Sequence, residues 1–195
     1  MSNSIQVIDD FLPSDIFSQL ASQCLEADGY SMADFATHTD EADGSKFNFG
    51  EGDPTPQAKV HEAVATFWLF QNSMNLKTDT VNHLHYYLKK EIEVLYNILN
   101  LKQMIGMRVS CTMAAQKNYV GAFHVDLNEH PYLHQMKTAI LYLNSNNGGT
   151  QIKDGKFIQS KLNRAVVFPC HQEHAGVWCT DKKLRFVLNM NYIEN

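Results

Sequence analysis

The chain has 195 residues, of which 44% are hydrophobic and 19% are charged, a composition typical of a soluble globular protein with enough apolar material for a core. The formal net charge is −5 and no basic cluster marks a phosphate-tracking surface, so dedicated nucleic-acid binding is not expected. No apolar run reaches membrane-spanning length, and the N-terminal residues lack the basic and apolar regions of a signal peptide. We therefore expect a single domain over residues 1–195 of a cytoplasmic protein with no membrane partner.

The first half of the chain favours helices. A short apolar strand is predicted from Ile5 to Ile8, and Ser14 can cap a helix whose apolar residues recur at helical spacing. Residues 28–55 are rich in Asp, Gly, Ser, Asn and Thr with isolated aromatics, which predicts a long loop. Beyond it we expect a second helix from Gln57 to Phe70 and a third that opens at Thr78 or Asp79.

From Ile105 onward the chain changes to short runs of β-branched and aromatic residues separated by turn signals. These runs are IGMRVSCTM, KTAILYLN, RAVVFP, GVWC and LRFVLNMNY. Short strands at close spacing predict an antiparallel sandwich or barrel. We therefore expect a mainly β protein with N-terminal helices (α+β). Residues 1–104 would supply supporting helices and a loop, and residues 105–195 would form the β-core. The scattered cysteines predict reduced thiols and not a disulfide framework: Cys24, Cys111, Cys170 and Cys179.

Three His-x-Asp/Glu triplets are candidates for a metal site. The triplet at His38 lies in the polar loop, where solvated loop residues are the simpler interpretation, and the triplet at His171 lies in PCHQEHAGVWC. His124 and Asp126 instead close an expected strand, so both side chains project from one face and can converge on one ion.

A third ligand has to come from another strand, because His130 and His134 are too near in sequence and suit a rim position. His171 and His174 remain. They are three residues apart, so on an extended segment they face opposite sides and at most one of them is a ligand. Two histidines and one carboxylate on one face of an octahedral ion would suit non-haem Fe(II) oxygen chemistry.

In these residues the sequence resembles the Fe(II)- and 2-oxoglutarate-dependent oxygenases, specifically the prolyl-4-hydroxylase-like group. That family has a His-x-Asp motif, a distal His some fifty residues later, and an Arg or Lys about ten residues beyond it. Here His174 follows His124 by 50 positions, and Arg185 follows His174 by 11 but His171 by 14. The stretches TAILYLNSNNGGTQI and IQVIDDFLPSDIFSQL also look like the family's inter-ligand strand and its opening strand and helix.

The resemblance implies a double-stranded β-helix (a jelly roll, cupin-like) with helices packed on one sheet, and a dioxygenase that hydroxylates a substrate C–H bond. His124, Asp126 and His174 would bind Fe(II), and Arg185 would hold 2-oxoglutarate. Tyr142 would donate a hydrogen bond to the same carboxylate. O2 and a peptide or small molecule would be the partners, with prolyl and other amino-acid residues among the substrates, and ascorbate is compatible as an additional reductant. Thr138 and Tyr119 are weaker candidates for the pocket wall.

Strand alternation gives a check that does not depend on the family. On LRFVLNMNY, Arg185, Val187, Asn189 and Asn191 share one face, and the opposite face is almost purely apolar. A polar pocket inside a jelly roll, with amphipathic helices outside, needs this pattern. An arginine among apolar strand residues is costly to bury without an anion, and a dicarboxylate supplies one.

Three other interpretations stay open from the sequence. A cupin-like metalloenzyme that does not use 2-oxoglutarate would keep the three metal ligands but would have no use for Arg185. A non-catalytic jelly-roll binding module would have lost the metal. Zinc at a Cys–His cluster is disfavoured because its spacing matches no usual knuckle.

Residues 28–55 are expected to form a mobile lid over the iron, or else a tolerated surface insertion.

Overall fold

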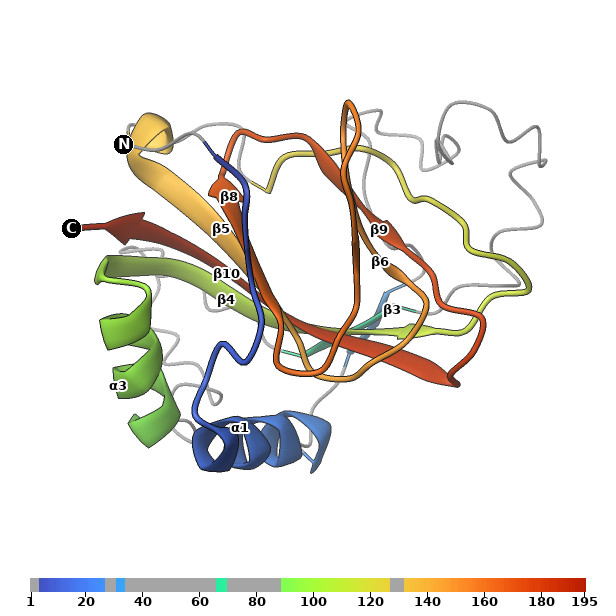
Figure 1. Ribbon diagram of the computed structural model, residues 1–195, viewed down its shortest axis with the longest axis horizontal. Coiled ribbons are helices and arrows are strands. Elements are labelled where there is room, and N and C mark those ends of the chain that lie inside the picture. Colours follow the sequence, from blue (N-terminus) through green and yellow to red (C-terminus); the bar gives the residue numbers. More distant parts are fainter. Residues whose placement is uncertain (1–3, 27–30, 34–65, 70–88, 127–131) are drawn as a thin grey trace.

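The computed structural model describes residues 4–26, 31–33, 66–69, 89–126 and 132–195. Two antiparallel sheets dominate it (Figure 1). The large sheet has seven strands in the order β1 (Gln6–Ile8), β8 (Ala165–Pro169), β5 (Met136–Tyr142), β10 (Leu184–Glu194), β4 (Leu101–Met113), β3 (Thr66–Leu69) and β2 (Ser31–Ala33). The small sheet has three, in the order β7 (Phe157–Gln159), β6 (Gly149–Ile152) and β9 (His174–Val177). The mainly β fold class with N-terminal helices is confirmed.

Two helices cover the outer face of the large sheet: α1 (Ser14–Glu26) and α3 (Lys89–Ile98) (Figure 1). One short 3-10 helix, η2 (Leu133–Gln135), precedes β5. In α1, Phe17, Leu20 and Cys24 are buried against the sheet, whereas Leu25 is 44% exposed. The apolar stripe expected from the sequence therefore forms, whereas Leu25 lies outside it.

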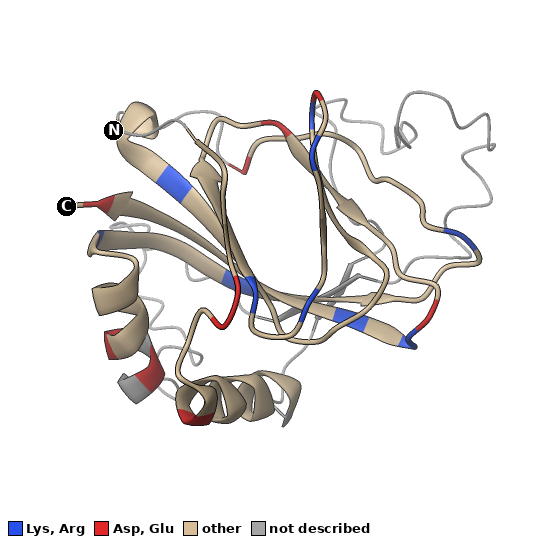
Figure 2. Ribbon diagram, in the orientation of Figure 1, with Lys and Arg blue, Asp and Glu red and all other residues tan. Residues whose placement is uncertain are grey.

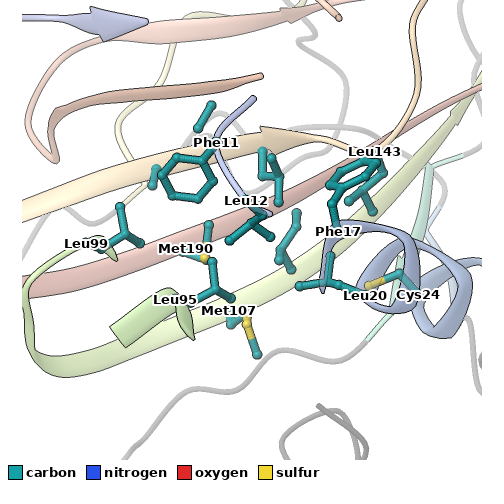
Figure 3. Packing of buried hydrophobic residues seen from close by; sticks show 14 of the residues in the cluster. Phe11, Leu12, Phe17, Leu20, Cys24, Leu95, Leu99, Met107, Leu143 and Met190 are labelled. Atoms are coloured by element: carbon teal, nitrogen blue, oxygen red, sulfur yellow. The ribbon is translucent and has the colours of Figure 1, made fainter. Parts of the chain in front are cut away.

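The alternation on the long strands separates two cores. The residues that face the helices form a cluster that includes Leu20, Leu95, Met107, Leu143 and Met190 (Figure 3). Residues one position away on the same strands point inward, between the sheets, and form a second cluster that includes Ile140, Tyr142, Phe168 and Val187. The predicted division of β10 into a pocket face and a helix face is thus confirmed, and β5 divides in the same way.

The chain between the helices differs from the expectation. Ser31–Ala33 is a strand within the region expected to be loop, and Thr66–Leu69 is a strand where the end of a second helix was expected. β2 pairs with β3, and β3 pairs with β4, so both extend the large sheet at its edge. The helix prediction was wrong at residues 66–69 because β-branched and aromatic residues there meet an open strand edge. Residues 27–30 and 34–65 lie outside the described part, so of the lid predicted over residues 28–55 only Ser31–Ala33 is described.

The third helix and the cysteine prediction agree with the structure where it describes them. α3 begins at Lys89, and the predicted helix start at Thr78 or Asp79 lies outside the described residues. All four cysteines are buried, and none of them forms a disulfide. Burial raises the pKa of the Cys24 thiol to about 12 and that of Cys111 to about 11, so these two thiols stay protonated at neutral pH.

Gly149 begins β6, and the close approach of another strand explains the glycine. A Cβ there would lie 2.1 Å from the backbone oxygen of Ile158. We expect Gly149→Ala to lower the free energy of unfolding by about 1–3 kcal/mol, because the β6–β7 pair must shift to admit the methyl group. Urea denaturation measures this.

Gly176→Ala is the matched control, because a Cβ at Gly176 meets no atom within 4 Å. Equal stability of the two variants would show that β7 adjusts without cost.

Candidate metal centre

His124, Asp126 and His174 come together at one end of the space between the sheets. Their ligand atoms all lie within 4.8 Å of one another, and they are the one such group of three or more His, Cys, Asp or Glu side chains in the described residues. His124 Nε2 and His174 Nε2 are each 3.8 Å from Asp126 Oδ1. The two imidazole ring centroids are 4.6 Å apart.

Backbone pairing is what brings the two histidines together. The His124 N–H donates to the His174 carbonyl and the His174 N–H donates to the His124 carbonyl, both at 3.0 Å. The two residues are thus directly opposite in an antiparallel bridge, although 50 positions separate them. Such a pair places both side chains on the same face.

Both imidazoles have their Nδ1 atoms occupied by backbone carbonyls. His124 Nδ1 is 3.1 Å from the Ala122 oxygen and His174 Nδ1 is 3.0 Å from the Gln172 oxygen. A proton on Nδ1 satisfies each carbonyl, so each Nε2 keeps a lone pair directed at the cluster. This is the tautomer that a metal ligand needs, held by the backbone.

The Asp126 carboxylate is held from two other strands. Thr138 Oγ1 on β5 donates to Oδ2 at 3.0 Å, and Asn189 Nδ2 on β10 lies 3.3 Å from Oδ1. Burial alone raises the pKa of Asp126, but His174, His124 and Arg108 together with the Thr138 hydrogen bond hold it below the ordinary value. The carboxylate therefore stays ionised at neutral pH.

Burial and the neighbouring His174 lower the pKa of His124, against the opposing charge of Asp126. The Phe168 ring packs at 4.8 Å from the His174 ring, which is 97% buried. A neutral His124 imidazole, an ionised carboxylate and apolar surroundings favour the coordination of a divalent cation.

A pocket leads from this cluster to Arg185 on β10. Both histidines line it, together with Arg108, Thr112, Thr150 and Asn189. Arg185 is 5% exposed, and its guanidinium donates to the Gly149 carbonyl at 2.8 Å and to Ser160 Oγ at 3.2 Å. Burial lowers the pKa of Arg185, and among the described residues no carboxylate forms a salt bridge with it. The pocket thus has a buried guanidinium group at one end and a cluster of potential metal ligands at the other.

Solved structures share this architecture at low sequence identity. A prolyl hydroxylase from Trichoplax adhaerens, in complex with a hypoxia inducible factor peptide fragment, has a TM-score of 0.56 and 13% identity over 99% of this chain and 84% of that chain. AviO1 from Streptomyces viridochromogenes Tue57 has a TM-score of 0.53 and 12% identity over 98% of this chain and 90% of that one. The chain has the jelly-roll fold of the 2-oxoglutarate oxygenases.

A non-heme alpha-ketoglutarate-dependent epimerase of nogalamycin biosynthesis, SnoN, shares the same 2-oxoglutarate-oxygenase fold. Its TM-score is 0.53 at 12% identity, with 98% of this chain and 78% of that chain covered. No protein-family model and no curated protein sequence matches the chain. The resemblance stated from the sequence is therefore confirmed through the fold.

The two candidates for the distal ligand, His171 and His174, have different surroundings in this fold. His171 is exposed in the turn between β8 and β9, whereas His174 begins β9 and is buried. His134 is exposed on η2, and His38 and His130 lie outside the described residues.

Neither of the two described helices has the length and apolar composition needed to cross a lipid bilayer.

Thr138 contacts the cluster itself and not a co-substrate pocket. Its hydroxyl lies 3.0 Å from Asp126 Oδ2 and 2.8 Å from Asn191 Oδ1. We expect Thr138→Val to weaken divalent-metal binding by about 10- to 100-fold, the usual effect of removing a group that orients a ligand. Competition with a chromogenic chelator measures this, and Thr180→Val, on the surface, is the control. An unchanged affinity would show that Asn189 alone orients the carboxylate.

Tyr142 is fully buried, and its hydroxyl lies 2.8 Å from Thr150 Oγ1 and 3.1 Å from the Ile158 carbonyl. Its ring lies beside Arg185, whose Cζ is 5.8 Å from the ring centroid. Of the two hydroxyls, Thr150 is the one that lines the pocket.

We therefore expect Tyr142→Phe to weaken 2-oxoglutarate binding only through Thr150, by about 0.5–1.5 kcal/mol, the net worth of one neutral hydrogen bond. Calorimetric titration checks this against Thr150→Val. A loss as large as that of Arg185→Ala would mean that Tyr142 itself contacts the ligand.

Tyr119 is half-buried on the segment before His124, and Lys117 Nζ lies 4.9 Å from its ring centroid. It does not line the pocket. Residues that the sequence did not single out do line it, namely Arg108, Ser110, Thr112 and Thr150. The first three alternate with Met107, Val109 and Cys111 on β4, so the period-two pattern that was used for β10 would also have identified them.

Proposed function

We propose that the protein is an Fe(II)- and 2-oxoglutarate-dependent dioxygenase that hydroxylates a substrate C–H bond and releases succinate and CO2. The observation that supports this best is the convergence of two Nε2 atoms and one ionised carboxylate in a buried pocket that also holds Arg185. Two imidazoles and one carboxylate form a facial triad that leaves the remaining positions of an octahedral ion open.

The donor set fits iron better than a structural zinc site. His124, Asp126 and His174 supply three ligands where a closed zinc site has four, and no cysteine belongs to the cluster among the described residues. When bound, the iron supplies the activation of O2 and of the 2-oxoglutarate keto acid, chemistry that belongs to the cofactor and not to side chains. The chain's own residues position the reactants and exclude water.

Arg185 is the residue we assign to the distal carboxylate of 2-oxoglutarate. Hydrogen bonds to Ser160 and to the Gly149 carbonyl hold the guanidinium group of Arg185 in place. Because both partners are uncharged, they do not neutralise the positive charge of Arg185. A carboxylate accepts two parallel hydrogen bonds from such a group. Thr150, positioned by Tyr142, lines the same end of the pocket and can donate a third.

Orientation of the metal ligands is the second role of the chain. The backbone carbonyls of Ala122 and Gln172 fix the two imidazole tautomers, and Thr138 and Asn189 fix the carboxylate. Ile140, Val177 and Val187 form the apolar part of the pocket wall, which limits water at the reacting centre. The substrate in this proposal is an amino-acid residue, prolyl residues included, or a small molecule.

Fe(II)-dependent conversion of 2-oxoglutarate to succinate tests the proposed function. We expect succinate release by the iron-loaded protein, none by Asp126→Ala, and nearly unchanged release by His171→Ala. Succinate at the same rate without iron would contradict the proposal. A jelly-roll enzyme that does not use 2-oxoglutarate would bind the metal but release no succinate with any substrate in a panel of peptides, amino acids and small acids.

A further inference from the structure

A glycine interrupts the pocket wall on β9, in the small sheet. His174 and Gly176 on this strand and Trp178 directly after it occupy alternate positions, and all three line the pocket. Residues two apart on an extended segment share one face. Gly176 therefore leaves a place without a side chain between a residue of the metal cluster and a large aromatic ring.

Strand register places Gly176 between the two ends of the pocket. Arg185 donates at 2.8 Å to the carbonyl of Gly149, and Gly149 pairs with Val177 on β9. The metal end of the same strand is His174. A ligand that spans from Arg185 to the cluster thus passes Gly176, which is one position from the arginine level and two from the histidine.

The facing wall of the pocket, in the large sheet, has the same order. On β10, Val187 lies between Arg185 and Asn189, whose Nδ2 is 3.3 Å from Asp126 Oδ1. The ligand would therefore run between Gly176 and Val187. Figure 2 shows no acidic band in the middle of β10. Both residues beside the middle of this path are uncharged, so the middle of the ligand suits an apolar group.

The space at Gly176 is open, unlike the space at a neighbouring glycine. Gly121 donates its N–H to the Gly176 carbonyl at 2.9 Å, and a Cβ at Gly121 would lie 3.0 Å from Cζ3 of Trp178. The tryptophan ring thus fills the place beside Gly121. A Cβ at Gly176 would meet no atom of the described residues within 4 Å. We call this place, which Thr150 flanks from the paired strand, the Gly176 recess.

We propose that the Gly176 recess takes a small apolar substituent on the carbon chain of the co-substrate, so that the pocket binds branched 2-oxo dicarboxylic acids as well as 2-oxoglutarate. Because Gly176 is nearer the level of Arg185 than that of His174, the substituent belongs on C4, next to the distal carboxylate. This inference rests on the proposed function, which places the two ends of the ligand. Gly176 is then the residue that determines which 2-oxo acids are accepted.

The test uses binding and not turnover. Fe(II)-loaded protein is titrated anaerobically in a calorimeter with 2-oxoglutarate and with each enantiomer of 4-methyl-2-oxoglutarate. The enantiomers are matched probes, because they differ only in whether the methyl group points to β9 or to the facing wall at Val187. We expect one enantiomer to bind within about threefold of 2-oxoglutarate and the other at least about tenfold more weakly, since one methylene without room in a pocket costs about 10- to 200-fold.

Gly176→Ala fills the recess with a methyl group of the protein. It should lower the affinity for the favoured enantiomer at least about tenfold more than it lowers the affinity for 2-oxoglutarate. Val187→Ala is the reciprocal variant, because it removes volume from the facing wall and should narrow the difference between the enantiomers. Urea denaturation and metal affinity show that each variant keeps its fold and its metal cluster.

The outcomes separate this inference from the proposed function. If 2-oxoglutarate binds but both enantiomers bind at least about tenfold more weakly, the recess admits no substituent and the inference is wrong. Equal losses for all three acids in Gly176→Ala would also overturn it, because the unbranched chain itself would then occupy the recess. If no 2-oxo acid binds to the metal-loaded wild-type protein, the proposed function fails together with the inference.

Discussion

His174→Ala is expected to abolish stoichiometric Fe(II) binding. The variant removes one of three ligand atoms, and Nε2 of His124 and the Asp126 carboxylate alone leave the ion with no third protein ligand. Loss of a group that only orients a ligand already costs about 10- to 100-fold in metal affinity, so loss of the ligand itself should exceed that range. Anaerobic titration with Fe(II), followed by metal analysis after gel filtration, measures the stoichiometry.

His171→Ala is the control for that experiment, because it lies three residues away and is exposed in the turn before β9. It should retain close to one Fe(II) per chain. Should His171→Ala empty the site while His174→Ala keeps it filled, the assignment of the distal ligand would be wrong. Protein purified without added iron is expected to carry nickel or zinc, since raw affinity favours later divalent metals.

Arg185→Ala is expected to weaken 2-oxoglutarate binding by more than about a hundredfold and to leave metal affinity nearly unchanged. The Arg185 side chain is 95% buried, and Ser160 and the Gly149 carbonyl hold its guanidinium group in place. Both partners are uncharged, so neither can replace Arg185 as the positive charge opposite a ligand carboxylate. Removing one partner of a buried charged pair costs on the order of 3–5 kcal/mol. Calorimetric titration of 2-oxoglutarate into metal-loaded protein measures the loss.

Arg164→Ala serves as the matched control for Arg185→Ala. Its guanidinium forms a surface ion pair with Asp9 at 2.6 Å, outside the pocket. Surface pairs of this kind contribute about 0–1 kcal/mol to stability, so this variant should bind 2-oxoglutarate like the wild type. Equal affinities of the two variants would show that Arg185 does not contact the ligand.

The β-half of the fold could be predicted because its strands alternate cleanly. On β10, Arg185, Val187 and Asn189 face the pocket while Leu188 and Met190 face the helices, as the period of two requires. The sequence could not predict β6 and β7, because strands of only four and three residues next to turn signals look like parts of turns until their partners are known. β3 was assigned to a helix for the same reason, since only its pairing with β4 makes it a strand.

The histidines show what sequence spacing can and cannot supply. Side chains alternate on an extended segment, so His171 and His174, three residues apart, were not both expected to be ligands. Only the family resemblance favoured His174. The proximity of His124 and His174 depends on a backbone bridge between residues 50 positions apart, which no local pattern encodes. Arg108 was not singled out from the sequence, although the period of two on its strand places it on the pocket face.

The metal dependence of 2-oxoglutarate binding tests the central claim most directly. We propose that one molecule of 2-oxoglutarate spans from Arg185 to an iron held by His124, Asp126 and His174, so its affinity has to depend on both ends. Calorimetric titration under anaerobic conditions should show one 2-oxoglutarate per chain with Fe(II) present and at least about tenfold weaker binding in metal-free protein, because the chelating interaction is then lost. Equal affinity with and without metal, or no binding in either state, would contradict the account.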